Sequence, residues 1–310
     1  MSMAETVAKW CARWKPLDRM TPSEWAESRR YLPPSMTSEP GNWRNNRTPY
    51  LVGIMDATVE RGVEVIVVLK CVQVGFSEAL RNLLGCWVDH DPGPAMLLMP
   101  SEQAARQTVD ERLRPLLLET PVLAKHLSDR REDNRLDVIR TDTMSIYMAW
   151  AGSPQALATR PVRRVLADEV DKYPPFAGKE ADPIRLAQKR TTTYGHRGLM
   201  ILGSSPTTRD GHIWKWWEGC TDRRHFFVPC PHCGHMQRLI WSQVHYPQRA
   251  EDVERVDHAE AVEAGKLAYY ECASCEARIE DRHKPAMLVR GEWRSETPGA
   301  SNRRIGFALN

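Results

Sequence analysis

The stretch Val65-Ile66-Val67-Val68-Leu69-Lys70-Cys71-Val72-Gln73-Val74-Gly75-Phe76-Ser77 decides the fold class of this chain. Its first five residues are apolar and mostly β-branched, which predicts a buried strand. The loop that follows leads into a helical pattern over residues 78–87. A loop between a strand and a helix N-terminus can wrap phosphate oxygens with its backbone N–H groups. Taken alone, it is more typical of an ordinary strand-to-helix turn, and only its context favours a nucleotide site.

The loop also departs from the common phosphate-binding pattern GxxxxGK[ST]. Gly75 and Ser77 occupy the sixth and eighth places of that pattern. Phe76 stands where the lysine is usual, and Lys70 stands where the first glycine is usual. The amine that a phosphate needs is therefore displaced to the start of the loop.

Further short apolar runs follow this first strand and are bounded by turn or polar residues. Several lead into helical patterns, notably over residues 101–118 with Ser101 as the N-cap. Apolar strands that alternate with helices predict an α/β fold with a mostly parallel central sheet flanked by helices. The runs lie at 95–99, 144–148, 165–167 and 199–202.

Two acidic residues, Asp168 and Glu169, follow the apolar run at 165–167. An aspartate at the tip of a strand can hold magnesium directly or through water, and a glutamate beside it can polarise the water that attacks a γ-phosphate. A strand that ends in a solvated acidic turn is the alternative. The run at 199–202 also ends in small polar residues, at 203–207. Because ligands bind beyond the carboxyl ends of parallel strands, these three strand endings predict one shared crevice.

Four cysteines in two CxxC pairs predict a metal site in the last third of the chain. Cys230 and Cys233 form the first pair, and Cys272 and Cys275 form the second. Four thiolates at this spacing can close one tetrahedral zinc shell, as in a small zinc ribbon. Disulfide pairing is the alternative, but the other cysteines are scattered without partner spacing. Since four sulfurs leave no open position, the predicted Zn²⁺ is structural.

The length and charge of the chain limit the classes of protein it can belong to, but they do not decide its function. Its 310 residues allow one large domain with a small appendage, and its net charge of +3 does not by itself indicate nucleic acid. Basic residues are nevertheless clustered, as in Arg160-Pro161-Val162-Arg163-Arg164. No apolar stretch is long enough to span a bilayer, and residues 1–14 lack the apolar core of a signal peptide. These features predict a soluble, intracellular protein without a membrane partner.

Taken in chain order, the motifs resemble the large terminase subunit of lambda-type tailed bacteriophages, the motor that packages DNA into a procapsid. The resemblance runs over most of the chain, and the displaced lysine is a peculiarity that this family shares. The motifs that carry it are Tyr31-Leu32-Pro33, Gly41-Asn42-Trp43, Val67-Val68-Leu69-Lys70, Val74-Gly75-Phe76-Ser77, Asp168-Glu169, Gly203-Ser204-Ser205-Pro206 and Cys230-Pro231-His232-Cys233-Gly234.

The resemblance implies a P-loop NTPase site that uses ATP and Mg²⁺. Lys70 is similar to the phosphate-binding lysine of the family, and Ser77 to the hydroxyl on the magnesium side. Asp168 and Glu169 are similar to the Walker B pair. The remaining implied residues bind ATP through the loop (Val74, Gly75, Phe76) or form the coupling motif that senses the γ-phosphate (Gly203, Ser204, Ser205).

Two departures from the family pattern concern positive charge. Gln73 stands where relatives tend to have an arginine, and Glu78 where some carry a second lysine. The charge that offsets the transition state must then come from elsewhere. Arg160, Arg163 and Arg164 are the candidates for this arginine finger, together with an arginine from a neighbouring subunit.

The resemblance further implies translocation of double-stranded DNA in the cytoplasm of an infected bacterial host. The expected partners are the terminase small subunit, the portal of the procapsid and further copies of the chain in a homo-oligomeric ring. DNA would be held through its phosphates, because a packaging motor must move any sequence. Family members continue into a nuclease domain that cuts concatemeric DNA, and we expect this chain to lack it.

The expected organisation has four parts. Residues 1–62 form a helical and loop region, with helices over 4–14 and 22–31, that completes the adenine side of the nucleotide site. There Tyr50 or Trp43 either stacks on the base or is a buried aromatic residue. Residues 63–224 form the ATPase core, and residues 225–283 form the zinc ribbon. Residues 284–310 return to the core or begin a linker, and the run at 304–310 is typical of a strand cut off in mid-architecture.

Two other functions stay open. A DNA helicase or remodelling ATPase would need paired RecA-like lobes, whereas one set of nucleotide motifs is present. A non-enzymatic zinc-ribbon adaptor that binds nucleic acid would carry a degenerate loop and turn over no ATP. Measurement of DNA-stimulated ATP hydrolysis separates these functions from a packaging motor.

Overall fold

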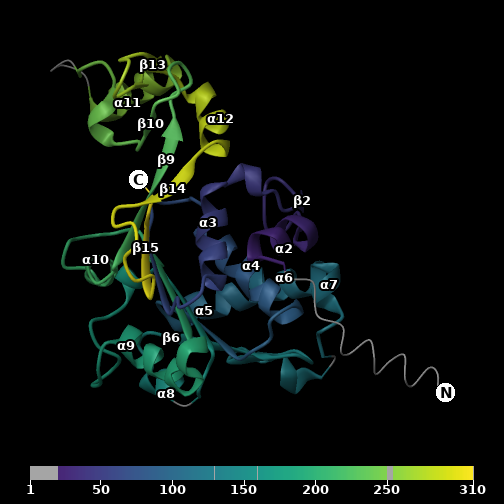
Figure 1. Cartoon of the computed structure of the whole chain (residues 1–310). Coiled ribbons are helices and arrows are strands. Elements are labelled where there is room, and N and C mark those ends of the chain that lie inside the picture. The colour runs from purple at the N-terminus through teal and green to yellow at the C-terminus, as the bar shows by residue number, and fades with distance from the viewer. Residues whose placement is uncertain (1–19, 129, 159, 250–253, 310) are drawn as a thin grey trace.

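A computed structural model describes residues 20–128, 130–158, 160–249 and 254–309, so the helix predicted over 4–14 lies outside the described residues. A ten-stranded sheet crosses the molecule in the order β10-β9-β15-β3-β8-β7-β4-β6-β5, and β14 also pairs with β9 (Figure 1). Every neighbouring pair from β9 to β6 is parallel, whereas β5, β10 and β14 pair antiparallel with their neighbours. The predicted α/β fold with a mostly parallel sheet is confirmed.

The main strands lie where the apolar runs predicted them. Two of them, β3 and β4, have the predicted bounds, β7 and β8 extend the predicted runs by two residues each, and β6 begins one residue later and ends two residues later than predicted. The strands of the sheet are β3 (Val65–Leu69), β4 (Ala95–Met99), β5 (Val138–Arg140), β6 (Ser145–Trp150), β7 (Arg164–Asp168), β8 (Leu199–Ser204), β9 (Asp222–Pro229), β10 (Met236–Gln237), β14 (Glu292–Ser295) and β15 (Arg304–Ala308).

Successive side chains of these strands enter two separate cores, because a strand points alternate residues to opposite faces. Ile66 and Val68 pack against one helical layer, while Val67 and Leu69 pack against the other. Both faces of the sheet are therefore covered, which explains why the strands are apolar throughout. The first layer holds α2 (Pro22–Arg29), α3 (Tyr50–Asp56), α4 (Phe76–Asp89), α5 (Glu102–Thr108), α6 (Arg114–Glu119) and α7 (Pro121–Ala124), and the second holds α8 (Pro154–Ala158), α9 (Pro183–Gln188) and α10 (His212–Glu218).

The helical pattern at 101–118 is interrupted in the structure. Ser101 caps α5 as predicted, since its side chain accepts the N–H of Ala104. A π-helical segment, Val109–Leu113, then separates α5 from α6. Among the described residues, no helix combines the length and the apolar character needed to cross a bilayer.

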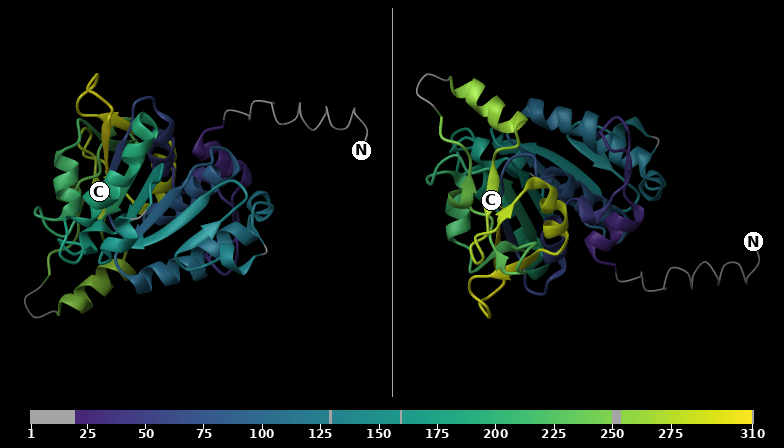
Figure 2. Two further views of the ribbon diagram at one scale, coloured as in Figure 1. Left: turned by 90° about the horizontal axis from the view of Figure 1, so that it is seen from below. Right: turned by 90° about the horizontal axis from the view of Figure 1, so that it is seen from above.

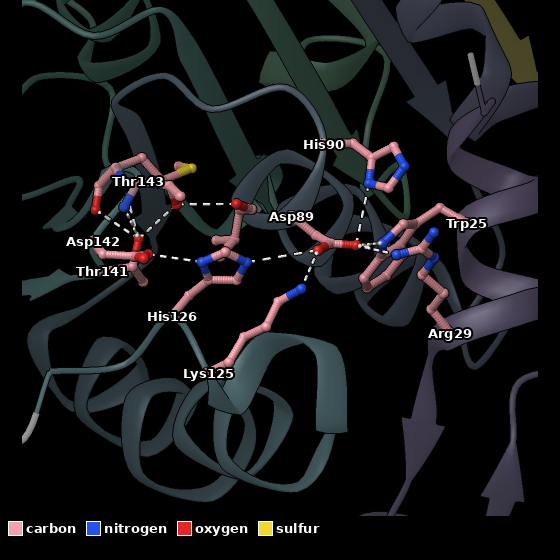
Figure 3. Close-up of polar contacts among 11 residues, drawn as sticks. Trp25, Arg29, Asp89, His90, Lys125, His126, Thr141, Asp142 and Thr143 are labelled. Atoms are coloured by element: carbon pink, nitrogen blue, oxygen red, sulfur yellow. Dashed lines mark hydrogen bonds and ion pairs between the residues drawn. The ribbon is translucent and has the colours of Figure 1, made fainter. Parts of the chain in front are cut away.

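The buried carboxylate of Asp89 joins the N-terminal region to the core (Figure 3). It lies at the end of α4 with a side chain that is 4% exposed. From α2 it accepts hydrogen bonds of Trp25 Nε1 at 2.9 Å and Arg29 Nη1 at 3.1 Å. Lys125 Nζ and His126 Nε2 approach from the other side at 3.5 and 3.6 Å. Burial by itself would raise the pKa of Asp89, but the Trp25 hydrogen bond and the surrounding cations lower it.

Residues 230–291, which we call the four-cysteine module, extend from one end of the sheet (Figure 1). The chain enters the module from β9 and returns through β14, which pairs antiparallel with β9. The predicted boundary at residue 225 therefore falls inside β9. The module contains a small sheet in the order β11-β12-β13. Its elements are β11 (Val244–His245), α11 (Arg255–Ala264), β12 (Tyr269–Glu271), β13 (Arg278–Ile279) and α12 (Lys284–Val289).

The strand predicted near residue 304 is a central element of the core. It is β15, which lies between β9 and β3 and is parallel to both. Figure 2 shows this yellow segment within the body of the molecule, although it comes last in the described chain. Residues 284–310 were expected to return to the core or begin a linker, and the strand Arg304–Ala308 does return to the core.

Candidate nucleotide and metal sites

Three neighbouring strands bring the predicted site residues to one edge of the sheet. In the order β3-β8-β7, the strands end at Leu69, Ser204 and Asp168. Lys70 directly follows β3, and its backbone N–H donates to Ser204 O at 3.1 Å. The carboxyl ends of the three parallel strands therefore meet beside one another.

The amine of Lys70 points at the paired acids. Its side chain is 6% exposed, and Nζ lies 2.7 Å from Glu169 Oε1. Lys172 Nζ lies 3.3 Å from the other oxygen of the same carboxylate. Burial would raise the pKa of Glu169, but the hydrogen bond and charge of Lys70 outweigh it and lower the pKa. Glu169 also adopts a left-handed backbone conformation with φ of 55°, which is strained for a residue with a Cβ.

Ser77 and Asp168 form a second pair beside the first. The Ser77 hydroxyl donates a hydrogen bond to Asp168 Oδ2, and Asp168 Oδ1 accepts the N–H of Glu169 at 3.0 Å. Asp168 is buried, and that burial raises its pKa while the Ser77 hydroxyl opposes the rise. A hydroxyl and a carboxylate in contact are the oxygen ligands that a P-loop site offers to Mg²⁺.

The loop before α4 presents backbone N–H groups to the same edge. Gly75 is the N-cap of α4 with φ of 77°, and no side chain caps the helix there. The first N–H groups of a helix have no partner within the helix, and the helix dipole makes them attractive to anions. The start of α4 is therefore suited to phosphate oxygens.

The packing of Phe76 accounts for an aromatic residue at the position where a lysine is usual. Its ring is 2% exposed and packs directly on Gly203, where a Cβ would lie only 2.0 Å from Phe76 Cε1. Lys70 Nζ lies 5.8 Å from the centre of the same ring, within range of a cation–π contact. The aromatic ring thus supports the displaced amine and links the first turn of α4 to β8.

Asp171 is a residue of this edge that the sequence analysis missed. Its backbone N–H donates to Ser204 Oγ at 3.2 Å. Its carboxylate accepts the N–H of Thr207 at 2.9 Å and the N–H of Ile213 at 2.7 Å. Asp171 therefore joins the end of β7, the end of β8 and the start of α10. Its position three residues after Asp168 was the available signal. Ser205 Oγ, beside these groups, is buried without a hydrogen-bond partner among the described residues.

The proposed arginine fingers do not reach this edge within one chain. Arg164 lies at the opposite end of β7, about 13 Å from Asp168 at 3.3 Å per residue, and Arg163 directly precedes it. Both form ion pairs with Asp91, and the Arg164 side chain is 3% exposed. The guanidinium of Arg160 stacks on the ring of Tyr147 at 4.7 Å. Arg160 and Arg163 precede β7 and Arg164 is its first residue, and a strand carries its two ends to opposite edges of the sheet.

The four cysteines meet in the module as the sequence predicted. Their Sγ atoms lie within 4.8 Å of one another, with Cys230 to Cys275 at 3.9 Å and Cys233 to Cys272 at 3.8 Å. Tetrahedral zinc with Zn–S bonds of about 2.3 Å separates its sulfurs by about 3.8 Å. These distances fit a zinc ion and are far too long for disulfide bonds.

The backbone around each cysteine pair also fits a metal-binding turn. The N–H groups of His232 and Ser274 lie 3.4 Å from the sulfurs of Cys230 and Cys272. Gly234, after the first pair, has φ of 75° and open space around it. The cluster is consistent with a zinc site whose shell is closed by four sulfurs.

Comparisons with known proteins agree with this geometry. Residues 37–293 match the family model of the phage terminase large subunit gpA, ATPase domain. The chain is 26% identical over 229 residues to the terminase large subunit of Enterobacteria phage P21, which covers 71% of this chain and 35% of that protein. It is 24% identical over 238 residues to the terminase large subunit of Escherichia phage lambda, with 73% and 36% covered. The chain spans about a third of the length of these relatives.

A solved structure shares the fold. The crystal structure of the HK97 bacteriophage large terminase aligns with a TM-score of 0.50 and 12% identity, over 63% of this chain and 39% of that one. Because the family match covers most of the chain, membership does not depend on this distant likeness. The chain belongs to the family of the phage terminase large subunit gpA ATPase domain.

Proposed function

We propose that this chain hydrolyses ATP to translocate double-stranded viral DNA into procapsids, as the motor portion of a terminase large subunit. The observation that carries the proposal is the 2.7 Å ion pair of Lys70 and Glu169 beside the Ser77–Asp168 hydrogen bond. An amine, a hydroxyl and two carboxylates thereby gather at the first turn of one helix. These are the groups that transfer of a phosphoryl group to water requires.

The triphosphate would lie against the start of α4. Its oxygens would accept hydrogen bonds from the backbone of the Val74–Ser77 loop, where Gly75 begins the helix. ATP carries several negative charges, so its phosphates would compete with Glu169 for the Lys70 amine. Arrival of ATP would therefore release Glu169 from its ion pair.

The released carboxylate would act as the general base. With Lys70 drawn to the phosphates, the Glu169 carboxylate can accept a proton from the attacking water. Ser77 Oγ and Asp168 Oδ2 are the atoms that would hold Mg²⁺, directly or through water. When bound, Mg²⁺ would offset the charge that develops on the phosphates.

The coupling motif would transmit the state of the nucleotide. Gly203 touches Phe76 of the loop, and Ser204 is hydrogen-bonded to Asp171. Asp171 in turn holds the start of α10 through Ile213. Loss of the γ-phosphate would therefore change the positions of β8 and α10 through only a few intervening residues. Ser205, the next residue of the motif, would move with them.

The partners of this motor follow from the family. We propose contacts with DNA phosphates, the terminase small subunit and the portal of the procapsid, and a homo-oligomeric ring in the cytoplasm of the infected host. A role for Arg160 as an arginine finger towards a neighbouring copy stays a prediction. Cutting of concatemeric DNA is proposed for the whole terminase protein. The matched part makes up only about a third of the length of the relatives from phages P21 and lambda.

Substitution of Glu169 tests the proposal. Glu169→Gln keeps the size of the side chain but removes the base, so DNA-stimulated ATP hydrolysis should fall about a hundredfold or more. ATP binding should persist, because Lys70 and the loop are intact. The matched control is Glu260→Gln, an exposed residue of α11.

Two results would count against the motor. An adaptor protein predicts no ATP turnover by the unaltered chain with Mg²⁺ and DNA, and retention of the full rate by Glu169→Gln would exclude the assigned base. Strand separation on a forked duplex would instead favour a helicase.

A further inference from the structure

A cavity of about 170 Å³ separates the phosphate loop from the four-cysteine module. Cys71 and Val74 line it from the loop. Arg238 and Lys284 line it from the module, and Leu309 lines it from the end of β15. Elements that are distant in sequence therefore share one small space next to the predicted ATP site.

The lining suits an aromatic ring attached to an anionic group. Tyr50 and Phe226 contribute aromatic surfaces, with ring centroids 6.0 Å apart at 81°. The charged side chains among the described lining residues are the basic Arg238 and Lys284. Lys284 has no ion-pair partner within 4.0 Å among the described side chains, and no Asp or Glu is among the described residues that line the cavity. His225, also in the lining, has a pKa that burial and the charge of Arg238 lower, whereas Glu296 opposes this shift. Glu296 Oε1 lies outside the lining, 2.6 Å from His225 Nε2 and 3.6 Å from Arg238 Nη1. Lys284 is therefore the cation of the lining without an acidic partner among the described side chains.

The size and position of the cavity limit what it can hold. Pockets that enclose whole drug-sized ligands measure about 300–1,000 Å³, so this one accommodates a ring system only. Val74 directly precedes Gly75, where α4 begins. Leu309 donates its N–H to Leu69 O at 2.8 Å, which places the cavity at the same edge of the sheet as Lys70. A nucleotide with its triphosphate at α4 would thus have its base next to the cavity.

Trp43, the other aromatic residue considered for the base, is not available to it. Its side chain is 7% exposed within the core, and Nε1 donates to Asn45 Oδ1 at 2.8 Å. Tyr50 remains, but its α3 supplies only one side of the space. The opposite side comes from β9, from Arg238 and Leu239 directly after β10, and from α12.

We infer that this cavity holds the base of bound ATP and that the four-cysteine module forms one wall of the ATP site. The inference rests on the proposed ATPase function and adds a role in nucleotide binding for the module. Leu239 and Leu288 pack against the base, while Arg238 and Lys284 face the ribose and the nearest phosphate. The module then has a role beyond stabilising the fold, because its residues form part of the surface that binds the base.

The cysteine cluster holds this wall in place. Gln237 Oε1 accepts the N–H of Ala273 at 2.9 Å, which ties β10 to the second cysteine pair. Arg238 is the next residue after Gln237, and β9, which contains Phe226, ends at Pro229 directly before Cys230. Loss of metal from the cluster should therefore displace the wall and weaken binding of the base, while leaving the phosphate loop in place.

Competition between ATP and inorganic tripolyphosphate tests the inference, because tripolyphosphate has phosphates without a base. The Leu288→Trp variant fills the cavity, and Lys284→Ala removes a cation from it. Leu288→Trp should weaken ATP binding about tenfold and leave tripolyphosphate binding unchanged, as measured by calorimetry on the full chain. Lys284→Ala should weaken ATP binding more than tripolyphosphate binding, because Lys284 faces the ribose as well as the nearest phosphate. Arg282→Ala, whose side chain is 74% exposed and outside the cavity, is the matched control.

The outcomes separate this inference from the proposed function. Lys70→Ala should weaken both ligands, which reports on the phosphate loop alone. Suppose that Lys70→Ala weakens the binding of both ligands. If Leu288→Trp and Lys284→Ala then leave the binding of ATP and of tripolyphosphate unchanged, or weaken the two equally, the role of the module as a wall is refuted and the proposed ATPase function stands. If the unaltered chain binds neither ligand, both proposals fail.

Alkylation of Cys71 gives a second readout without altering the fold. This thiol is exposed and lines the cavity. ADP should slow its reaction with a maleimide at least fivefold more than tripolyphosphate does, as followed by mass spectrometry of the peptide. Equal protection by the two ligands would overturn the inference.

Discussion

The contact between Phe76 and Gly203 predicts a strong effect of adding a single methyl group. In Gly203→Ala the new Cβ would lie 2.0 Å from Phe76 Cε1 and 2.4 Å from Cζ. Real Cβ contacts are much longer, so either the ring or β8 must move. The ring is 2% exposed and lies in a packed core, which leaves it little space to rotate away.

The cost of this change can be worked from its surroundings. Overpacking of a filled core typically costs about 1–3 kcal/mol, and we expect the upper part of that range because β8 is paired on both sides. Displacement of Phe76 would also shift the first turn of α4, so ATP hydrolysis should fall along with stability. Urea unfolding and DNA-stimulated ATPase rates measure the two effects. Gly152→Ala is the matched control, because nothing lies within 4 Å of its added Cβ.

A double substitution separates this contact from a general defect. Phe76→Leu removes the part of the ring that meets the new methyl group, so Gly203→Ala should cost much less in that background. An equal cost in both backgrounds would refute the assignment of the clash to Phe76. Gly203→Ala with unaltered stability and activity would refute the packing argument as a whole.

Two further predictions concern the ends of the fold. Asp89→Asn should lower the free energy of unfolding at pH 7 by about 1.5–3 kcal/mol, the value of hydrogen bonds to a charged group, whereas exposed Asp257→Asn should not. The pKa of Asp89 is depressed in the folded state, so its contribution to the free energy of unfolding is present above about pH 4 and is lost as the pH falls through the pKa of the folded state. Urea unfolding curves of the variant and the unaltered chain should therefore converge in acid, and a difference that stays constant with pH would contradict this. Cys272→Ser should abolish stoichiometric zinc in native mass spectrometry while Cys71→Ser retains it, and zinc retention by Cys272→Ser would show that the cluster is not a four-sulfur site.

Much of the fold was predictable because its central strands are continuously apolar. A run such as Val65–Leu69 can be buried only inside a sheet that is covered on both faces, and its bounds follow from the polar residues around it. The cysteine pairs were equally informative, since their spacing alone determines which sulfurs can share a metal. The interruption of the helix after Thr108 had one signal in the sequence, because Pro115 lies two residues after the π-helical segment and has no backbone N–H to donate.

The candidate site was predictable in its members but not in all its contacts. Polar residues at strand ends indicated that Lys70, Asp168 and Glu169 would converge. Charge alone suggested Arg163 and Arg164, and the direction of β7 places them at the wrong edge. Local sequence shows which residues are charged, whereas the edge on which they lie depends on the path of the strand through the sheet.

The sequence by itself determined the strands, the loop before α4 and the two cysteine pairs, because each depends on residues within a few positions of one another. Only the tertiary structure decided that Lys70 meets Glu169, that β15 lies between β9 and β3, and that the four-cysteine module borders the phosphate loop. These contacts join segments far apart in the chain. Their pairing is selected by how whole strands and helices pack together, and no local pattern of residues encodes that choice.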